Sequence, residues 1–286
     1  MNAAGTIASS TWEEAAQSRI VTATVVLSLI VLALSAWTFS HLGGLGIRVG
    51  AFFGADTKPV ASQLLILLMY LWSGMVAVAA AFFGAVAVAG EIASGEAVSV
   101  LARPVRRAEL LLGRWLGLAI VIAAFAAAAS AAQIFVVYLT SGFVPANALG
   151  VVVFVVAQAL VILTVAVALA TRLSVAGAAV TTLLLFGVAW VGGVIGGIGA
   201  WTNGPALMQA SSLTKLLLPS DAVWRGALFM LERPGGVFSG ARSVTMAANP
   251  VFGADDAAPE LLLAYALAWI GVVLGASILA FRSRDL

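Results

Sequence analysis

Six long apolar stretches are the feature of this chain that most restricts its fold. Each is long enough to cross a bilayer core of about 30 Å as a helix, which takes about 20 residues. Charged residues make up only 9% of the chain, against about 25% in an ordinary soluble protein, and disordered chains are also richer in charge. We therefore predict an all-α polytopic membrane protein with six transmembrane helices, over 20–40, 63–90, 110–140, 149–171, 173–201 and 260–281.

The distribution of arginine and lysine predicts the orientation of these spans. An even number of spans places both termini on one side of the membrane. On that side the short tract from Arg103 to Arg114, which runs into the start of the third span, holds four arginines, whereas most basic residues of the other side are spread over the long segment 202–259. Basic residues in short loops mark the cytoplasmic side, and long loops count less. Both termini are therefore expected in the cytoplasm, in a bacterial or archaeal plasma membrane.

Two segments outside the spans are expected to contain short helices. In residues 1–19, the sequence Ser10-Thr11-Trp12-Glu13 fits a capping box, which predicts an elbow helix on the membrane surface rather than a frayed tail. Residues 202–259 are too many for a bare loop, so one or two short helices are expected near the outer leaflet. This outer segment would gate substrate exit, bind an outer-side protein or only shield the ends of the spans.

Several kinds of chemistry are excluded by the residues present. The chain has no cysteine and a single histidine, so thiolate chemistry and histidine-cluster metal sites are excluded. It also lacks a phosphate-binding loop that ends in Gly-Lys-Ser/Thr and a Gly-x-Ser-x-Gly elbow. We expect no catalytic residue, no metal and no cofactor on this chain. The positive net charge is accounted for by loop arginines, so no nucleic-acid partner is expected.

Mildly polar side chains are the only candidates for a pathway inside the spans. The apolar cores contain no charge, so coupling to protons or sodium has no support and any energy source would lie outside the chain. Hydrogen bonding between helices is the favoured role for any single polar residue. The alternative is a lining for an amphiphilic substrate, and the candidates are Ser73, Gln133, Gln158, Thr181 and Thr182.

Glycines are concentrated in the fifth span. Small residues allow membrane helices to approach closely, so these positions predict close packing, either within one subunit or between two copies of the chain. Their spacing does not distinguish the two arrangements. The glycines concerned are Gly187, Gly192, Gly193, Gly196, Gly197 and Gly199.

The loop at 91–109, between the second and third spans, carries charges of both signs around an Arg103-Pro104 break. Proline disfavours helix at the preceding residue, so a short helix would end there. One interpretation is a docking surface that passes motion from a soluble partner to the spans. The other is a positive loop that only fixes the topology.

The tract from Gly90 to Gly117 resembles the signature of type-2 ABC transporter permeases. Its matching features are Gly90-Glu91-Ile92, Ser94-Gly95, Arg103-Pro104-Val105-Arg106-Arg107 and Leu110-Leu111-Leu112-Gly113-Arg114. The ending Phe281-Arg282-Ser283-Arg284-Asp285-Leu286 is similar to the common terminus of that family. The stretch from Leu217 to Asp221, with Trp224-Arg225, also resembles its fifth-to-sixth connection.

This resemblance implies a permease subunit with six spans, an elbow helix and a cytoplasmic coupling helix at 91–109. Two such permeases, here expected as a homodimer, pair with two separate ATPase subunits that bind ATP and Mg. The substrate would be a lipid, a glycan, a drug or another hydrophobic solute. The residues expected to couple to the ATPase are Glu91, Glu96, Arg103, Pro104, Val105, Arg106 and Arg107.

Two other functions remain open from the sequence. An ATPase-independent carrier or channel would work without a partner. A non-transporting scaffold for an outer-side protein would rely on the long segment 202–259.

Overall fold

The computed structural model describes residues 9, 11, 19–41, 57–94, 106–231 and 259–282. In these residues the fold is helical and contains no strand. The elements are α2 (Arg19–Ser40), α4 (Thr57–Ala85), the π-helical turn η1 (Val86–Gly90), α5 (Glu91–Ser94), α7 (Arg107–Ser141), α8 (Ala148–Ala170), α9 (Val175–Thr202), α10 (Pro205–Leu217), α11 (Ser220–Leu231) and α12 (Pro259–Arg282).

Six of these helical stretches are long and apolar enough to cross a membrane, which confirms the predicted all-α, six-span fold. They are α2, α4 continued through η1 and α5, α7, α8, α9 and α12. Of the predicted elbow helix, the structure describes only Ser9 and Thr11, and both are helical. Residues 95–105 of the predicted coupling helix lie outside the described residues.

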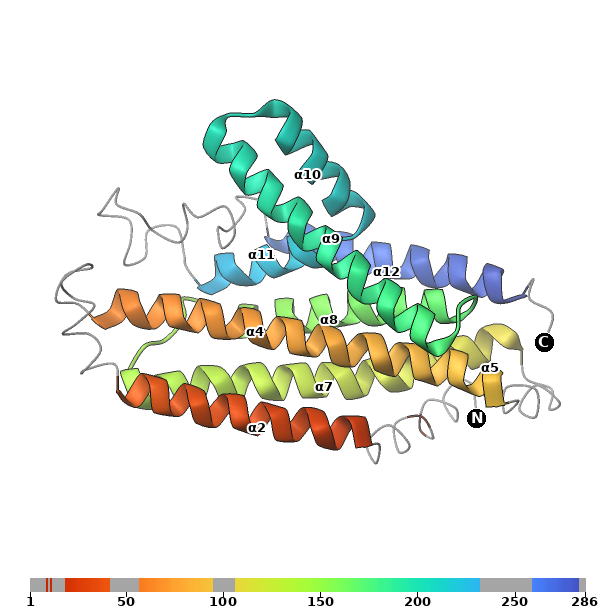
Figure 1. The fold of residues 1–286 in the computed structure, drawn as a ribbon, viewed down its shortest axis with the longest axis horizontal. Helices are drawn as coiled ribbons and strands as arrows, with labels where there is room; N and C mark the ends of the chain where they lie inside the picture. The colour runs from red at the N-terminus through yellow and green to blue at the C-terminus, as the bar shows by residue number, and fades with distance from the viewer. Residues whose placement is uncertain are drawn as a thin grey trace.

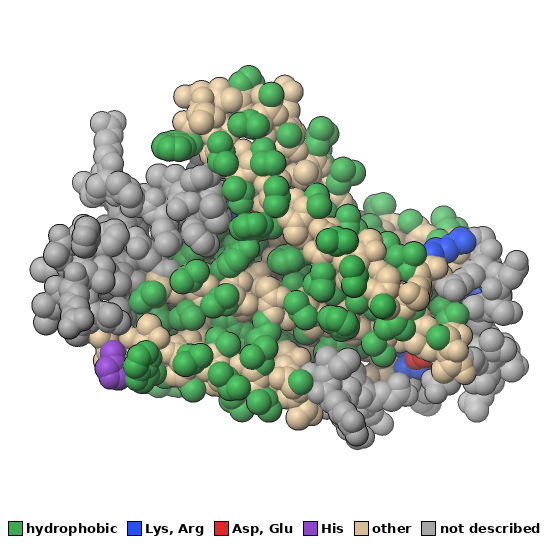
Figure 2. Space-filling view, viewed as in Figure 1, with side chains coloured by type: hydrophobic (Ala, Val, Ile, Leu, Met, Phe, Trp, Pro, Cys, Tyr) green, Lys and Arg blue, Asp and Glu red, His purple; other side chains and the backbone are tan. Residues whose placement is uncertain are grey.

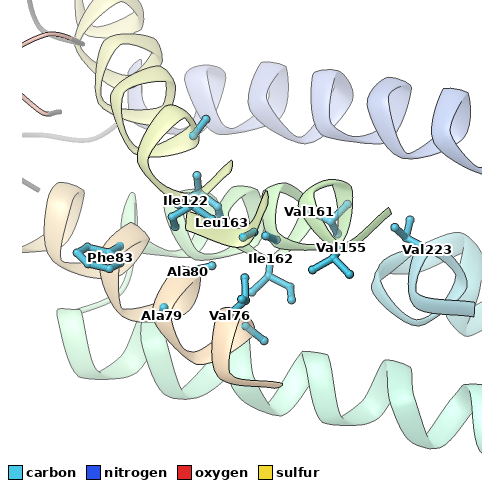
Figure 3. Packing of buried hydrophobic residues seen from close by; sticks show 14 of the residues in the cluster. Val76, Ala79, Ala80, Phe83, Ile122, Val155, Val161, Ile162, Leu163 and Val223 are labelled. Atoms are coloured by element: carbon cyan, nitrogen blue, oxygen red, sulfur yellow. The ribbon is translucent and has the colours of Figure 1, made fainter. Parts of the chain in front are cut away.

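Helix α8 forms the centre of the bundle, and it is the most buried of the six spans, whereas α2 is the least buried. It packs against α4, α7, α9, α11 and α12, and Figure 1 shows it behind α4 and α7. Burial of these apolar side chains at native density holds the helices together. Figure 3 shows part of the shared core, with Val76 and Phe83 from α4, Ile122 from α7, Val155 and Ile162 from α8 and Val223 from α11.

Local capping residues set the ends of the central helices. Helix α8 begins after Asn147, whose side-chain oxygen accepts from the backbone N–H of Gly150 at 2.9 Å. Helix α9 begins in the same way after Ser174, whose hydroxyl accepts from Gly177 N. Asparagine and serine are favoured at this position because they satisfy an otherwise unpaired N–H. The connection between α8 and α9 is therefore a short, defined turn.

Helices α10 and α11 turn the chain back into the bundle after the fifth span. Figure 1 shows α9 and α10 projecting from the bundle as a hairpin, with α11 returning beside α12. Tyr265 Oη and Trp269 Nε1 of α12 donate to the backbone carbonyls of Leu216 and Leu217, which end α10. At 1.5 Å per residue, these two donors lie roughly 9 and 15 Å along α12 from its start. The α10–α11 turn thus lies beside the first half of α12.

Charged side chains of the described residues gather at one end of the bundle. Helix α2 begins and α12 ends at the same end, where α7 begins and α8 turns into α9. We call this the arginine end, because Arg106, Arg107, Arg114 and Arg172 lie there. Figure 2 shows blue and red side chains at this end, while hydrophobic side chains cover most of the described surface along the bundle on the same face.

Candidate functional site

Arg114 joins three elements at the arginine end. Its guanidinium forms an ion pair with Glu91 of α5, and its Nη1 donates to Thr11 Oγ1 at 2.9 Å. The side chains of Arg114 and Glu91 are each only 11% exposed. Removal of one member of a buried pair is strongly destabilising, because it leaves the other charge uncompensated. Arg114 therefore ties the end of the second span to the start of the third and to the segment that precedes the first.

The π-helical turn η1 places Glu91 in reach of Arg114. It interrupts the second span over Val86–Gly90, immediately before Glu91. A π-turn has a wider hydrogen-bonded ring than an α-turn, so it changes the direction in which the following side chains point, and such turns are frequent at functional sites. No signal in the sequence marks this interruption, because the apolar run continues through it.

Arg106 and Arg107 have different environments although they are neighbours. The backbone N–H of Arg106 donates to Glu109 Oε2 at 3.0 Å, which caps the start of α7, and the Arg106 side chain is exposed. Arg107 is half-buried, and its Nη1 donates to the backbone carbonyl of Phe281 at 3.3 Å. The first of these arginines faces outward, and the second holds the end of the last span.

The predicted coupling residues therefore fall into three groups. Glu91 and Arg107 have contacts within the chain, and Arg106 presents its side chain outward. The remaining four, Glu96, Arg103, Pro104 and Val105, lie outside the described residues, so their coupling role stays a prediction.

The predicted pathway residue Gln133 instead connects the first three spans. Its Oε1 accepts from Ser35 Oγ of α2 at 3.1 Å and from Trp72 Nε1 of α4 at 3.0 Å. Its Nε2 is buried and has no hydrogen-bond acceptor among the described residues. A buried donor without a partner is costly, which distinguishes Gln133 Nε2 from the bonded Oε1 of the same amide.

Three other predicted pathway residues, Ser73, Gln158 and Thr182, are also hydrogen-bonded within the protein. Ser73 Oγ of α4 donates to Gln158 Oε1 of α8 at 2.7 Å, and Thr182 Oγ1 donates to the carbonyl of Ala178 in its own helix. Thr181 is half-buried on α9. The structure thus uses Ser73, Gln133 and Gln158 as hydrogen-bonding links between spans, which is the role favoured for any single polar residue.

Sequence reasoning missed a buried ion pair in the interior of the bundle. Arg225 Nε donates to Asp221 Oδ2 at 2.8 Å, and both side chains are 3% exposed. The two residues lie one turn apart on α11. They belong to residues 202–259, which the sequence predicts as an outer segment. The only available signal was the i,i+4 spacing of opposite charges, which favours pairing on a helix.

Three aromatic rings, from α4, α9 and α11 itself, lie close together beside this ion pair. The ring of Tyr70 lies 5.8 Å from that of Trp224 and 6.1 Å from that of Trp190. The indole N–H groups of both tryptophans have no acceptor among the described residues. Buried polar groups normally have partners, so these two indole N–H groups are exceptions. They lie with the Asp221–Arg225 ion pair at the contact of α4, α9 and α11.

The glycines of the fifth span pack within one chain. A Cβ atom at Gly192 would lie 2.2 Å from Thr214 Oγ1, and one at Gly196 would lie 2.2 Å from Ser211 Oγ, so α10 lies directly on α9. Gly199 also faces α10, and Gly193 faces Asp221 of α11. Of the two arrangements left open by the sequence, these four positions therefore show packing inside one subunit.

Comparison with protein-family models gives a match over residues 6–286 to the family described as ABC-2 family transporter protein. None of the curated proteins compared with the chain matches it.

Proposed function

The chain belongs to the ABC-2 family of transporter proteins and is the permease subunit of an ABC transporter, and we propose that a separate ATPase subunit binds its arginine end. The family implies association with an ABC-type ATPase. The observation that supports this docking place is the clustering of arginines at the end from which the 95–105 loop emerges. In this proposal ATP and Mg are bound by the partner, and the permease itself is not a catalyst.

The proposed docking surface consists of the loop 95–105 together with Arg106. The exposed guanidinium of Arg106 suits a carboxylate of the ATPase, because Arg–carboxylate pairs are strong and directional. Glu91 and Arg107 contribute to coupling through their contacts within the permease, since the structure gives each of them a partner in its own chain.

The wider assembly is also part of the proposal. We infer two copies of the permease with two ATPase subunits, in a bacterial or archaeal plasma membrane with both termini cytoplasmic. The least buried spans, α2, α9 and α12, offer apolar surface to the bilayer and to a second copy. The unpartnered amide of Gln133 supports a pathway-lining role for that residue when the spans move apart. An outer-side protein partner stays a prediction.

The docking proposal is tested by affinity purification of the full-length permease together with an ABC-type ATPase expressed from the same genome. We expect an ATPase to be retained, and we expect Arg106→Glu to reduce its retention about tenfold, as for loss of an interfacial charge pair. Arg106→Lys keeps the charge and serves as the matched control.

Arg107→Glu is less specific, because it would also remove the contact with the Phe281 carbonyl. A permease that transports at the same rate with no ATPase present would overturn the proposal. Retention that is unchanged in Arg106→Glu would remove Arg106 from the docking surface.

A further inference from the structure

Phe281 closes the arginine end of the bundle. Its side chain is 2% exposed although it lies one residue before the end of α12. It shares a small pocket with residues from the two stretches of chain that flank the 95–105 loop. We call these residues the socket; they are Ala87, Val88, Glu91, Ile92, Leu110, Leu111 and Arg114.

Two arginines hold the backbone of α12 beside the socket. Arg107 Nη1 donates to the carbonyl of Phe281, and Arg172 Nη2 from the α8–α9 turn donates to the carbonyl of Ala280 at 2.9 Å. The last carbonyls of a helix have no partner inside it, and positive side chains there are favourable. The end of the last span is thus fixed to the start of α7 and to the α8–α9 turn.

The other half of α12 holds the turn that carries α11 into the bundle. Tyr265 Oη and Trp269 Nε1 donate to the carbonyls of Leu216 and Leu217, the last two residues of α10. Those carbonyls also lack partners within their helix, and α11 with its buried ion pair follows three residues later. The position of this turn therefore depends on the position of α12.

Helix α12 is suited to carry a displacement along its length. It is one continuous α-helix of 24 residues whose only proline is at its first position, whereas the second span is interrupted by η1. Sharp bends arise mainly at prolines, π-turns and Gly/Ser pairs. Helix α12 has no proline or π-turn inside it, and it stays α-helical through Gly271 and Gly275. A shift of Phe281 is therefore passed to Tyr265 and Trp269 rather than absorbed between them.

We propose that α12 is a rigid link between the roots of the coupling loop and the buried helix α11, with Phe281, Tyr265 and Trp269 as its positioning residues. Motion of the loop roots displaces Phe281, and α12 then shifts the α10–α11 turn inside the bundle. The mechanical link rests only on contacts within this chain. Its use in transport rests on the proposed docking of an ATPase at the arginine end.

A thiol introduced at position 220 provides a reporter of the α10–α11 turn. Ser220 is 0% exposed and its hydroxyl has no hydrogen-bond partner among the described residues. The chain has no cysteine of its own, so Ser220→Cys introduces a single thiol, which we call the turn reporter. We would measure the rate at which N-ethylmaleimide alkylates this thiol in the full-length protein in lipid nanodiscs. Labelling requires the turn to open, so its rate reports the opening equilibrium.

Phe281→Ala is the main perturbation. We expect it to raise the labelling rate of the turn reporter about fivefold, because the socket no longer positions α12. Leu279→Ala is the matched control, since Leu279 is on the same helix and 65% exposed; it should leave the rate unchanged. Equal rates in the two variants would overturn the link.

Tyr265→Phe combined with Trp269→Phe tests the other half of the link, because it removes both donors. It should also raise the labelling rate of the turn reporter about fivefold. In a serial link, adding Phe281→Ala to this variant gives little further increase. Multiplication of the two effects would show that the sites act independently, and that result would overturn the proposal.

A second reporter separates this effect from loss of fold. Ser130 is buried in α7, and the thiol of Ser130→Cys should stay unreactive in every variant. If Phe281→Ala exposes both reporters, the milder Phe281→Leu takes its place, with the same expected selectivity for the turn reporter. Exposure of both reporters by this variant as well would refute a specific link.

Nucleotide addition to the permease–ATPase complex then tests the role in coupling. ATP should change the labelling rate of the turn reporter in the Ser220→Cys protein and leave it unchanged when Phe281→Ala is present. A response that persists in Phe281→Ala overturns the coupling role of α12. Another outcome is that ATP leaves the labelling rate of the turn reporter unchanged in every variant while Phe281→Ala and the Tyr265→Phe, Trp269→Phe pair still fail to multiply. That result counts against the proposed function and supports the mechanical link within the chain.

Discussion

Gly193 of α9 lies against a buried carboxylate, and replacing it with alanine is predicted to force α9 away from α11. A Cβ atom at position 193 would lie 1.8 Å from Asp221 Oδ2 and 2.4 Å from Asp221 Cγ. Ordinary contacts of a Cβ atom begin at 3.4 Å, so one of the two groups must move by about 1.5 Å. The carboxylate is held in place, because Arg225 Nε donates to it and both side chains are buried.

The size of the effect depends on whether the added methyl group breaks the Asp221–Arg225 pair or pushes α9 and α11 apart. Breaking a buried ion pair costs about 3–5 kcal/mol, and overpacking a well-packed interior costs about 1–3 kcal/mol. The helices can share the displacement, so we expect Gly193→Ala to lower the free energy of unfolding by about 2–4 kcal/mol. For a chain of this size that corresponds to a fall of about 5–10 °C in the thermal midpoint.

The assay is thermal unfolding of the purified protein in one detergent at one scan rate, because membrane proteins often unfold irreversibly and the midpoint then depends on the rate. Gly187→Ala is the matched control on the same helix, since no atom lies within 4 Å of its added Cβ. Alanine is the better helix former, so this control should keep or raise the midpoint.

Two results would refute the reasoning about Gly193. The first is a midpoint for Gly193→Ala equal to that of Gly187→Ala. The second comes from the background Asp221→Ala with Arg225→Leu, which removes the carboxylate. There Gly193→Ala should lose most of its effect, because the group it collides with is absent. A full effect in that background would place the clash elsewhere.

Three further substitutions have expected outcomes. Trp72→Phe removes one of the two donors to Gln133 Oε1 and leaves a cavity, because Trp72 is fully buried; it should lower the thermal midpoint by the equivalent of about 2 kcal/mol. Glu91→Ala leaves the Arg114 guanidinium without its carboxylate; it should cost about 3 kcal/mol in the same assay, and Glu91→Gln should cost less. Asn147→Ala removes the N-cap of α8, so hydrogen exchange of the first turn of α8 should quicken about fivefold, as expected for a cap of about 1 kcal/mol.

The number and type of the spans could be predicted from the sequence because those properties are local. A long apolar run without interior charge has few alternatives to a membrane helix. The ends of the helices are also local where a capping residue is present, as at Asn147 and Ser174. The interruption at η1 could not be predicted, because Val86–Gly90 is as apolar as the helix before it.

The position of α11 could not be predicted because it depends on contacts between distant segments. A helix with a paired aspartate and arginine in a long connection resembles a surface element. What holds it inside is close packing, with Gly226 against Phe154 of α8 and Gly193 against Asp221. Sequence also could not distinguish Arg106 from Arg107, since their opposite directions depend on α7 beginning at Arg107.

The two buried ion pairs among the residues that the structure describes have opposite mechanical consequences. Asp221 and Arg225 lie on one helix, so α11 carries each charge together with its counter-charge when it moves. The attraction between these two charges therefore does not oppose a shift of α11 against its neighbours.

Glu91 and Arg114 lie on different elements, so a movement of α5 against α7 must either break the pair or take both elements along. At the arginine end, the Glu91–Arg114 pair therefore favours joint motion of α5 and α7, which keeps the socket around Phe281 as one unit. In the interior, α11 carries no net charge and can slide against its neighbours more easily. Removing both charges of α11, in Asp221→Asn with Arg225→Met, keeps that helix neutral and adds no bulk against Gly193. This double variant should preserve the unreactive state of the turn reporter at position 220, whereas Asp221→Asn alone should not, because it leaves the arginine buried without a counter-charge.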